Sequence, residues 1–224
     1  MLSLLESRND IGPLLMATAD VSSLYTIIPH FLACEATKWG LRRHSNLPCI
    51  QRKYIVKCLD FCLKHSHFWY NHEYYQQTTG VAMGAKFAPS VAGLFMSKWE
   101  EESVFLEQHE DLVMYKRYID DIFIIWKGDR CGLVLFFEKL NINSKNITLT
   151  WQIEEKQISF LDLEISRIKD KFATKTFFKN VDRNSYLPIR AATTKTGCLT
   201  SLKVNFLDLG ATAQIPKTSG CKPI

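Results

Sequence analysis

Short apolar runs alternate along the chain with longer segments of helical periodicity. The run from Leu14 to Val21 follows Gly12-Pro13 and is apolar apart from Thr18 and a single acid, which predicts a β-strand. Similar runs bounded by turn-forming residues predict further strands at 112–118, 122–127, 147–153, 158–165 and 172–178.

Apolar residues at helical spacing, together with proline positions, predict helices at 30–43, 50–65, 89–108 and 129–140. Ser97 to Glu102 are expected to give the third of these helices a charged outer face. Residues 68–75 are rich in aromatics and predict a hairpin that turns at Asn71-His72, and residues 78–89 form a loop of small residues. This order of elements predicts an α+β fold, a mostly antiparallel sheet with helices on one face.

Composition narrows the class of protein. The chain has 224 residues, 46% of them hydrophobic and 23% charged, which suits a globular core and excludes intrinsic disorder. No apolar run is long enough to span a bilayer, and the first ten residues lack the apolar stretch of a secretory signal. We therefore expect an intracellular protein with reduced cysteines and no membrane partner. The oligomeric state, and the choice between nucleus and cytoplasm, stay open.

Two adjacent acids, Asp120 and Asp121, interrupt an otherwise apolar and β-prone stretch. Aspartate is depleted within strands, so the pair is expected in the tight turn of a hairpin. One interpretation is turn chemistry alone. The other is a pair of carboxylates that bind metal.

A third acid, Asp20, lies at the end of the first predicted strand, where a charge is costly unless it is paired or binds metal. It could also be a cap or turn residue that leads into Ser22-Ser23. If its strand neighbours the strands around Asp120, three carboxylates converge. Such oxygen ligands suit Mg²⁺, and two ions about 4 Å apart can clamp a phosphoryl transfer.

Four segments together resemble reverse transcriptases of the Penelope-like retroelements. The segment from Asp20 to Pro29 resembles the first catalytic motif, Gln77 to Pro89 the second, and Tyr118-Ile119-Asp120-Asp121 the third; Ile158 to Ile165 resembles the strand beyond them. The stretch Asp182-Arg183-Asn184-Ser185 is also similar to a segment downstream of the palm. Order and spacing agree over about residues 10–190, so we expect a palm-like domain at 1–190.

The resemblance implies an RNA-directed DNA polymerase acting on an RNA/DNA primer–template and deoxynucleoside triphosphates. It implies that Asp20 and Asp120 hold two Mg²⁺ ions, for which Mn²⁺ could substitute, and that Asp121 supports or shares them. Tyr25 would exclude a 2′-hydroxyl, although it could equally be a core tyrosine. Gly84 and Pro89 would shape the loop against the template base and incoming nucleotide. The proton donor could be either Lys145 or Lys156.

Some features depart from the family. Only 19 residues precede Asp20, so we expect a truncated copy without fingers and thumb that is inactive as an isolated chain. Residues 191–224 have an irregular composition, and the stretch from Val204 to Ala213 matches the family pattern when read in a shifted frame, so we expect a frameshifted tail. The alternative function is a non-catalytic, retroelement-derived remnant that binds nucleic acid or protein.

Three further groups of residues each allow a functional and a structural interpretation. Cys58 and Cys62, with His65 and His67 nearby, could bind zinc, but their helical spacing favours a buried, metal-free core. The aromatic hairpin could stack bases, but core packing is favoured. Scattered basic pairs could contact phosphates or form a solvated surface, and with a net charge of +5 a nucleic-acid partner is permitted but not required; they are Arg42-Arg43, Arg52-Lys53 and Lys116-Arg117.

Overall fold

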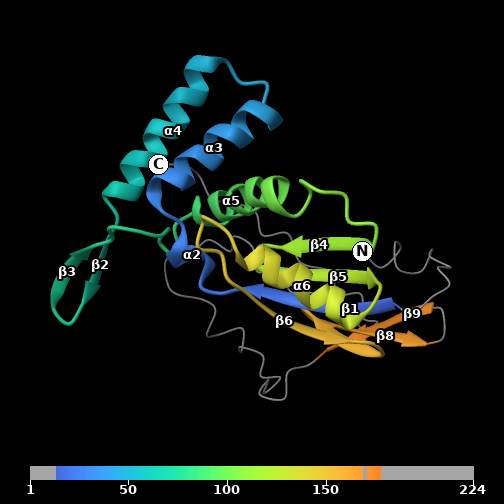
Figure 1. The fold of residues 1–224 in the computed structure, drawn as a ribbon. Coiled ribbons are helices and arrows are strands. Elements are labelled where there is room, and N and C mark those ends of the chain that lie inside the picture. The colour runs from blue at the N-terminus through green and yellow to red at the C-terminus, as the bar shows by residue number, and fades with distance from the viewer. Residues whose placement is uncertain (1–13, 169–170, 178–224) are drawn as a thin grey trace, which may run out of the picture. The chain divides into compact units, whose positions relative to one another are not determined.

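The computed structural model describes residues 14–168 and 171–177 (Figure 1). They belong to one compact unit, Met1–Phe178, whereas the second unit, Lys179–Ile224, lies outside the described residues. The expected frameshifted tail at 191–224 and the segment Asp182–Ser185 therefore cannot be placed. Among the helices that are described, none is long and apolar enough to cross a membrane.

The centre of the fold is a four-stranded antiparallel sheet with the order β4-β5-β1-β6. Its strands are β1 (Leu14–Val21), β4 (Leu112–Tyr118), β5 (Asp121–Lys127) and β6 (Leu149–Glu154). Strand β1 has a partner on each side, and side chains on both of its faces are buried, which explains why its sequence is almost continuously apolar.

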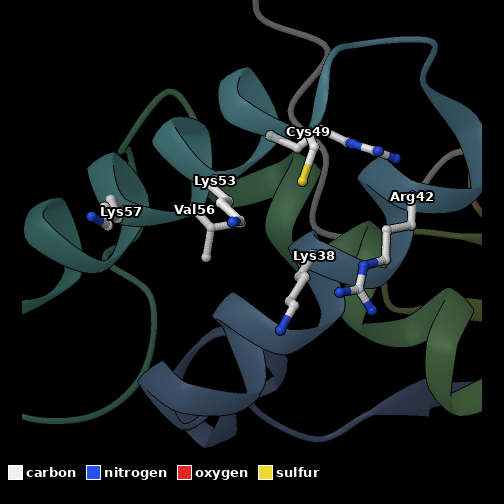
Figure 2. Close-up of a pocket in the computed structure, with 7 residues that line it drawn as sticks. Lys38, Arg42, Cys49, Lys53, Val56 and Lys57 are labelled. Atoms are coloured by element: carbon white, nitrogen blue, oxygen red, sulfur yellow. The ribbon is translucent and has the colours of Figure 1, made fainter.

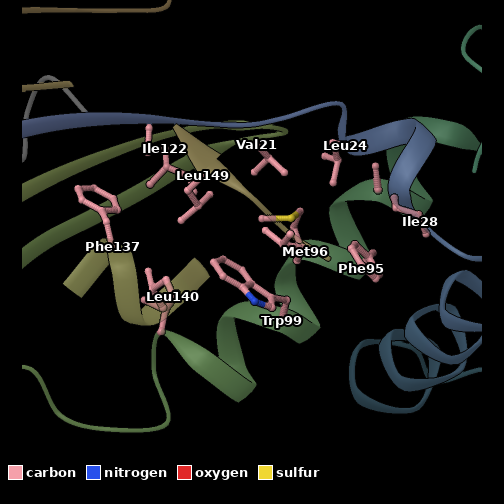
Figure 3. Packing of buried hydrophobic residues seen from close by; sticks show 14 of the residues in the cluster. Val21, Leu24, Ile28, Phe95, Met96, Trp99, Ile122, Phe137, Leu140 and Leu149 are labelled. Atoms are coloured by element: carbon pink, nitrogen blue, oxygen red, sulfur yellow. The ribbon is translucent and has the colours of Figure 1, made fainter. Parts of the chain in front are cut away.

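Two helices cover one face of this sheet, as predicted: α5 (Ala88–Ser103) and α6 (Arg130–Asn141) (Figure 1). Proline stands in the first turn of α5, and Asp129 caps α6 by accepting a hydrogen bond from the backbone N–H of Gly132 at 3.0 Å. Alternate strand residues point to this face and pack against large side chains of the helices, as Figure 3 shows; labelled examples are Val21, Ile122, Trp99 and Phe137.

A second antiparallel sheet covers the opposite face. It consists of β7 (Gln157–Phe160), β8 (Leu163–Ile168) and β9 (Lys171–Thr176). The other alternate residues of β1 and β5, such as Met16 and Phe123, pack against it. The single strand expected at 158–165 is wrong, because a turn at Leu161, with φ of 54°, divides it into β7 and β8.

Between β1 and α5 the chain forms α2 (Leu24–Ile27), α3 (His30–His44), α4 (Cys49–Lys64), β2 (His67–Tyr70) and β3 (Glu73–Gln76). Helix α3 packs against both α4 and α5, whereas the β2–β3 hairpin continues from the end of α4 (Figure 1). The hairpin turns at Asn71 and His72, both with positive φ, as predicted.

Four sequence-based predictions about the segment from α4 to α5 are wrong. Every residue of β2 and β3 is exposed, so the aromatic hairpin is not core. Cys58 and Cys62 are also exposed rather than buried. Within the described fold, Leu59 and Leu63 are the buried residues of α4. Finally, α5 ends at Ser103 instead of 108, and Glu100, expected on its charged outer face, is buried.

Candidate active site

The sheet brings the three predicted acids together at one end of β1 and β5. In the antiparallel register Asp20 lies opposite Asp121, and the backbone N–H of Val21 donates to the carbonyl of Asp120 at 3.2 Å. The two acidic segments therefore occupy neighbouring strands although about a hundred residues separate them in the sequence. The metal-site hypothesis requires these two strands to be neighbours, and in the sheet they are.

Asp20 and Asp121 both line a pocket of about 300 Å³. They share the strand face of Met16 and Phe123, so the pocket opens between the central sheet and the second sheet. Its remaining lining is mostly polar or aromatic, and includes Thr18, Thr150, Gln152, Ser159 and Phe160. None of the described residues that line it is a lysine or an arginine.

The surroundings of Asp20 disfavour the charged form of its carboxyl group. Partial burial raises the pKa of its carboxyl group above the ordinary value, and the negative charge of Asp120 raises the pKa further. A divalent cation would relieve both effects, so the chemistry of these donors fits Mg²⁺. Among residues 14–168 and 171–177, however, no three His, Cys, Asp or Glu side chains stand ready to enclose one ion. Mg²⁺ commonly uses one or two carboxylates and completes its shell with water and substrate phosphates.

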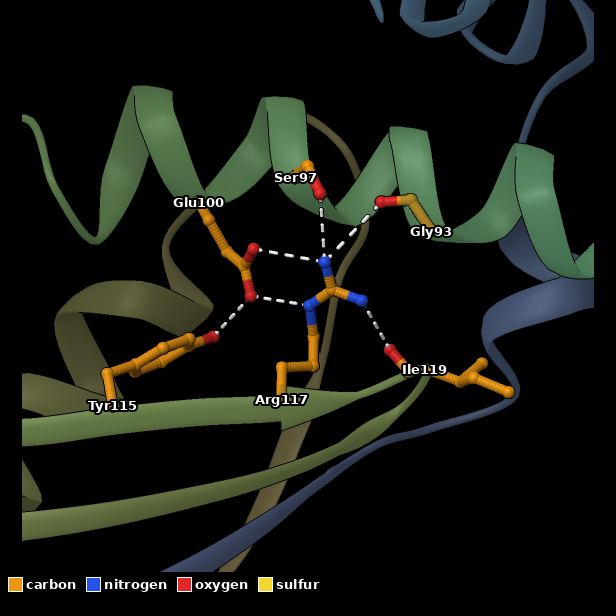
Figure 4. A network of polar contacts seen from close by, with 6 residues as sticks. All are labelled: Gly93, Ser97, Glu100, Tyr115, Arg117 and Ile119. Atoms are coloured by element: carbon orange, nitrogen blue, oxygen red, sulfur yellow. Dashed lines mark hydrogen bonds and ion pairs between the residues drawn. The ribbon is translucent and has the colours of Figure 1, made fainter. Parts of the chain in front are cut away.

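The turn that carries Asp120 has a strained backbone. Ile119 has φ of 55°, a conformation that is uncommon for a β-branched residue and costs about 1–2 kcal/mol. One guanidinium N–H of Arg117 donates to the carbonyl of Ile119 at 3.0 Å (Figure 4). Because the carbonyl of Asp120 is held by Val21, the turn is fixed from two sides.

Arg117 is itself fixed by Glu100 on helix α5. Its Nε lies 2.5 Å from one carboxylate oxygen and a terminal nitrogen lies 3.1 Å from the other, and this nitrogen also contacts Ser97 (Figure 4). The hydroxyl of Tyr115 donates to Glu100 at 2.8 Å. Burial, followed by the charge of Glu100, raises the pKa of Tyr115 well above its ordinary value, so Tyr115 stays a donor.

Sequence reasoning missed this Arg117–Glu100 network. It placed Glu100 on a solvated face and treated Lys116-Arg117 as one basic pair. The available signal was strand alternation: neighbouring residues of β4 point to opposite faces, so Lys116 is exposed whereas Arg117 faces α5. An arginine that faces a helix needs a buried acid, and Glu100 supplies it.

The other predicted site residues lie around α2 and the loop after β3. Tyr25 is half-buried against the helix-face core, and its carbonyl accepts the N–H of Val81 at 2.7 Å. Gly84, with φ of 91°, and Pro89, in the first turn of α5, are both exposed. None of these three lines the carboxylate pocket, so the structure does not bring them together with the acids there.

The two candidate proton donors lie at opposite ends of β6. Lys145 precedes the strand at the Asp20 end, and its amine is already paired with Glu102. Lys156 is exposed and follows the end where Glu154 pairs with Met16, four positions along β1 from Asp20. Neither lysine lines the pocket.

No protein-family model and no curated protein sequence matches the chain. Solved structures do resemble it. A telomerase of Candida tropicalis aligns over 77% of this chain with a TM-score of 0.57 and 12% identity. The telomerase of Candida albicans, solved with a fragment of telomeric RNA, aligns over 78% with a TM-score of 0.58 and 14% identity.

An RNA-dependent RNA polymerase of a human picobirnavirus aligns over 71% of this chain with a TM-score of 0.50 and 12% identity. The fold is polymerase-like. At these identities the similarity shows the fold alone. The alignments cover 37%, 33% and 31% of the three solved chains, so this chain spans about a third of their length.

Proposed function

We propose that this chain forms the palm of an RNA-directed DNA polymerase related to those of Penelope-like retroelements. The observation that carries the proposal is the pairing of Asp20 with Asp121, beside Asp120, at one end of an antiparallel sheet in a polymerase-like fold. Its substrates would be an RNA/DNA primer–template and deoxynucleoside triphosphates.

In this proposal Asp20 and Asp120 would hold two Mg²⁺ ions, and Asp121 would support or share them. When bound, such ions lower the pKa of an attacking hydroxyl and stabilise charge on the transferring phosphate. The protein's own contribution is to hold the carboxylates in place: β1 and β5 fix Asp20 and Asp121 through their register, and Arg117 fixes the turn before Asp120. Carboxylate oxygens that are already held in place need not reorganise during the reaction.

The loop after β3 would contact the nucleotide. Tyr25 would exclude a 2′-hydroxyl, and Gly84 and Pro89 would lie against the template base and the incoming nucleotide. Gly84 supports this role because a Cβ built there would meet no atom within 4 Å, so a ligand can approach the backbone closely.

We also propose that the isolated 224-residue chain extends primers weakly or not at all. A triphosphate needs cations to hold it in line, and the pocket at Asp20 has no Lys or Arg among its described lining. The same observation favours the second candidate function, a non-catalytic, retroelement-derived remnant that binds nucleic acid or protein. The two candidates differ in whether the carboxylates bind metal.

Metal binding tests this difference without requiring turnover. Titration of the full chain with Mn²⁺, followed by calorimetry, should show carboxylate-dependent binding, and Asp120→Asn should weaken it about tenfold or more. Glu110→Gln, at an exposed position, is the matched control and should leave binding unchanged. Equal affinity in the wild type and in Asp120→Asn would favour the non-catalytic candidate.

Primer extension on an RNA template with Mg²⁺ or Mn²⁺ completes the test of function. Any deoxynucleotide incorporation by the chain, alone or joined to further polymerase segments, should disappear in Asp120→Asn. Incorporation that persists in this variant would contradict the proposed site. Robust incorporation by the 224 residues alone would contradict the proposed weak activity, but not the site.

A further inference from the structure

A basic groove lies between helices α3 and α4. The groove has a volume of about 330 Å³, and five of its seven lining residues are Lys or Arg. Lys38 and Arg42 come from α3, and Arg52, Lys53 and Lys57 come from α4. Figure 2 labels Lys38 and Arg42 on α3, and Lys53 and Lys57 on α4 beside Cys49 and Val56, which also line the groove. The basic groove therefore brings Arg42 of one predicted basic pair together with the pair Arg52-Lys53.

None of these five cations has an ion-pair or hydrogen-bond partner within the described part of the chain. The acids of the two helices are Glu35 and Asp60, and they pair with Lys98 and Lys64 instead. No acid among the described residues lines the groove. Cations on successive turns of one helix, such as Lys53 and Lys57, also repel each other. Within residues 14–168 and 171–177, the positive charge of the groove is therefore uncompensated.

Helices α3 and α4 are rich in basic residues. Residues 30–64 contain seven Lys or Arg and two acids, a net charge of +5 within 35 residues. Five of the seven cations line the basic groove. The groove therefore lies in a strongly basic segment of the chain.

We propose that the basic groove binds the phosphate backbone of a nucleic-acid strand. Cations four positions apart lie about 6 Å apart along a helix, so each helix presents a row of charges rather than a single anion site. Arginine and lysine in such rows suit successive phosphates. A second hollow adjoins the groove through Lys38 and Arg42, and its other lining residues are Glu35, Trp39, Arg43 and Lys98. Because Arg43 and Lys98 pair with acids, the cations of the two hollows that have no partner in the described part of the chain are those of the groove.

This inference deepens the proposed function, because it adds a nucleic-acid contact outside the carboxylate pocket. The two sites share no lining residue. The test is anisotropy of a labelled twelve-nucleotide RNA with the full chain at several salt concentrations. The groove variant combines Arg52→Gln, Lys53→Gln and Lys57→Gln. The charge-matched control neutralises three exposed cations on other elements: Lys127→Gln, Arg130→Gln and Lys171→Gln.

The groove variant should bind about tenfold more weakly and should lower the slope of log affinity against log salt by about 2, because three phosphate contacts are lost. The control should change affinity by less than about twofold. Equal weakening by both variants would overturn the proposal and assign binding to net charge. Arg42→Lys with Arg52→Lys keeps the charge and should keep binding, which guards against loss of fold.

Two further arms separate the alternatives. Polyglutamate of equal charge should compete poorly; if it displaces the RNA as well as unlabelled RNA does, the groove is a general acidic-partner site and the proposal fails. Asp120→Asn should leave RNA binding by the groove intact. Failure of the carboxylate site therefore appears in Mn²⁺ binding alone, and failure of the groove appears in RNA binding alone.

Discussion

Arg117 connects three parts of the molecule through one guanidinium group. It pairs with Glu100 on α5, it belongs to β4, and it donates to the carbonyl of Ile119 in the strained turn. Its side chain is 13% exposed and that of Glu100 is 10% exposed, so neither charge is well solvated. Removal of one partner from such a pair leaves the other charge buried and uncompensated.

We expect Arg117→Met to lower the free energy of unfolding by about 3–5 kcal/mol, because Glu100 loses its partner. The double variant Arg117→Met with Glu100→Gln should recover most of this loss, since glutamine can still accept from Tyr115. Urea unfolding measures both variants. Mn²⁺ binding should be weaker than in the wild type in both the single and the double variant, because both lack the contact between Arg117 and the carbonyl of Ile119. Full recovery of Mn²⁺ binding would mean that Arg117 stabilises the fold without positioning the turn.

At the scale of elements, the loop after β3 is fixed to α2 through Gly80. The N–H of Gly80 donates to the carbonyl of Ile28 at 3.1 Å, and His30 contacts the Gly80 carbonyl at 3.0 Å. Gly80 has φ of 79°, and a Cβ there would lie 2.9 Å from backbone atoms of Thr26. Gly84 also has positive φ but has open space around it.

The two glycines give a matched pair of variants. Gly84→Ala should cost about 1–2 kcal/mol, because only the left-handed backbone is strained. Gly80→Ala should cost clearly more, because the new methyl group also meets the Thr26 backbone and must displace the loop. Thermal unfolding of both variants measures the difference. Equal costs would show that the loop shifts freely against α2.

The positions of the helices and strands were largely predictable from the sequence. Which of their faces other elements bury was not. Apolar runs located β1, β4 and β5 and the four long helices because the period of a pattern follows from local geometry. The same pattern gave α4 an apolar face but could not say what covers it. In the described fold Ile50, Tyr54 and Ile55 of this face are exposed. The acids of the site were predictable as residues, but the Arg117–Glu100 contact depends on how β4 packs on α5.

At the scale of the whole molecule, the central sheet lies between two apolar layers. One layer is formed with α5 and α6, and the other with β7, β8 and β9. Phe123 belongs to the second layer, is fully buried and lies 5.5 Å from the ring of Phe160, measured between centroids. Phe160 also lines the pocket of Asp20 and Asp121, so the second layer supports the candidate site.

We expect Phe123→Ala to lower the free energy of unfolding by about 3–5 kcal/mol, because it leaves a cavity between the two sheets. Leu135→Ala, at a side chain that is 64% exposed, should change it by less than about 0.5 kcal/mol. Urea unfolding monitored by far-UV circular dichroism measures both variants. A small effect of Phe123→Ala would mean that the second sheet contributes little to the stability of the fold.

The order of the central sheet also has a consequence for synthesis. Strand β1 pairs with β5 and β6, and the hydroxyl of Thr150 on β6 reaches the Asp20 carbonyl across 130 residues of sequence. At translation rates of about 5–20 residues per second, β1 therefore waits roughly 6–26 s on the ribosome before both neighbours exist. During that interval an apolar strand with two unpaired edges is open to aggregation, so the nascent chain should depend on chaperones more than its size suggests.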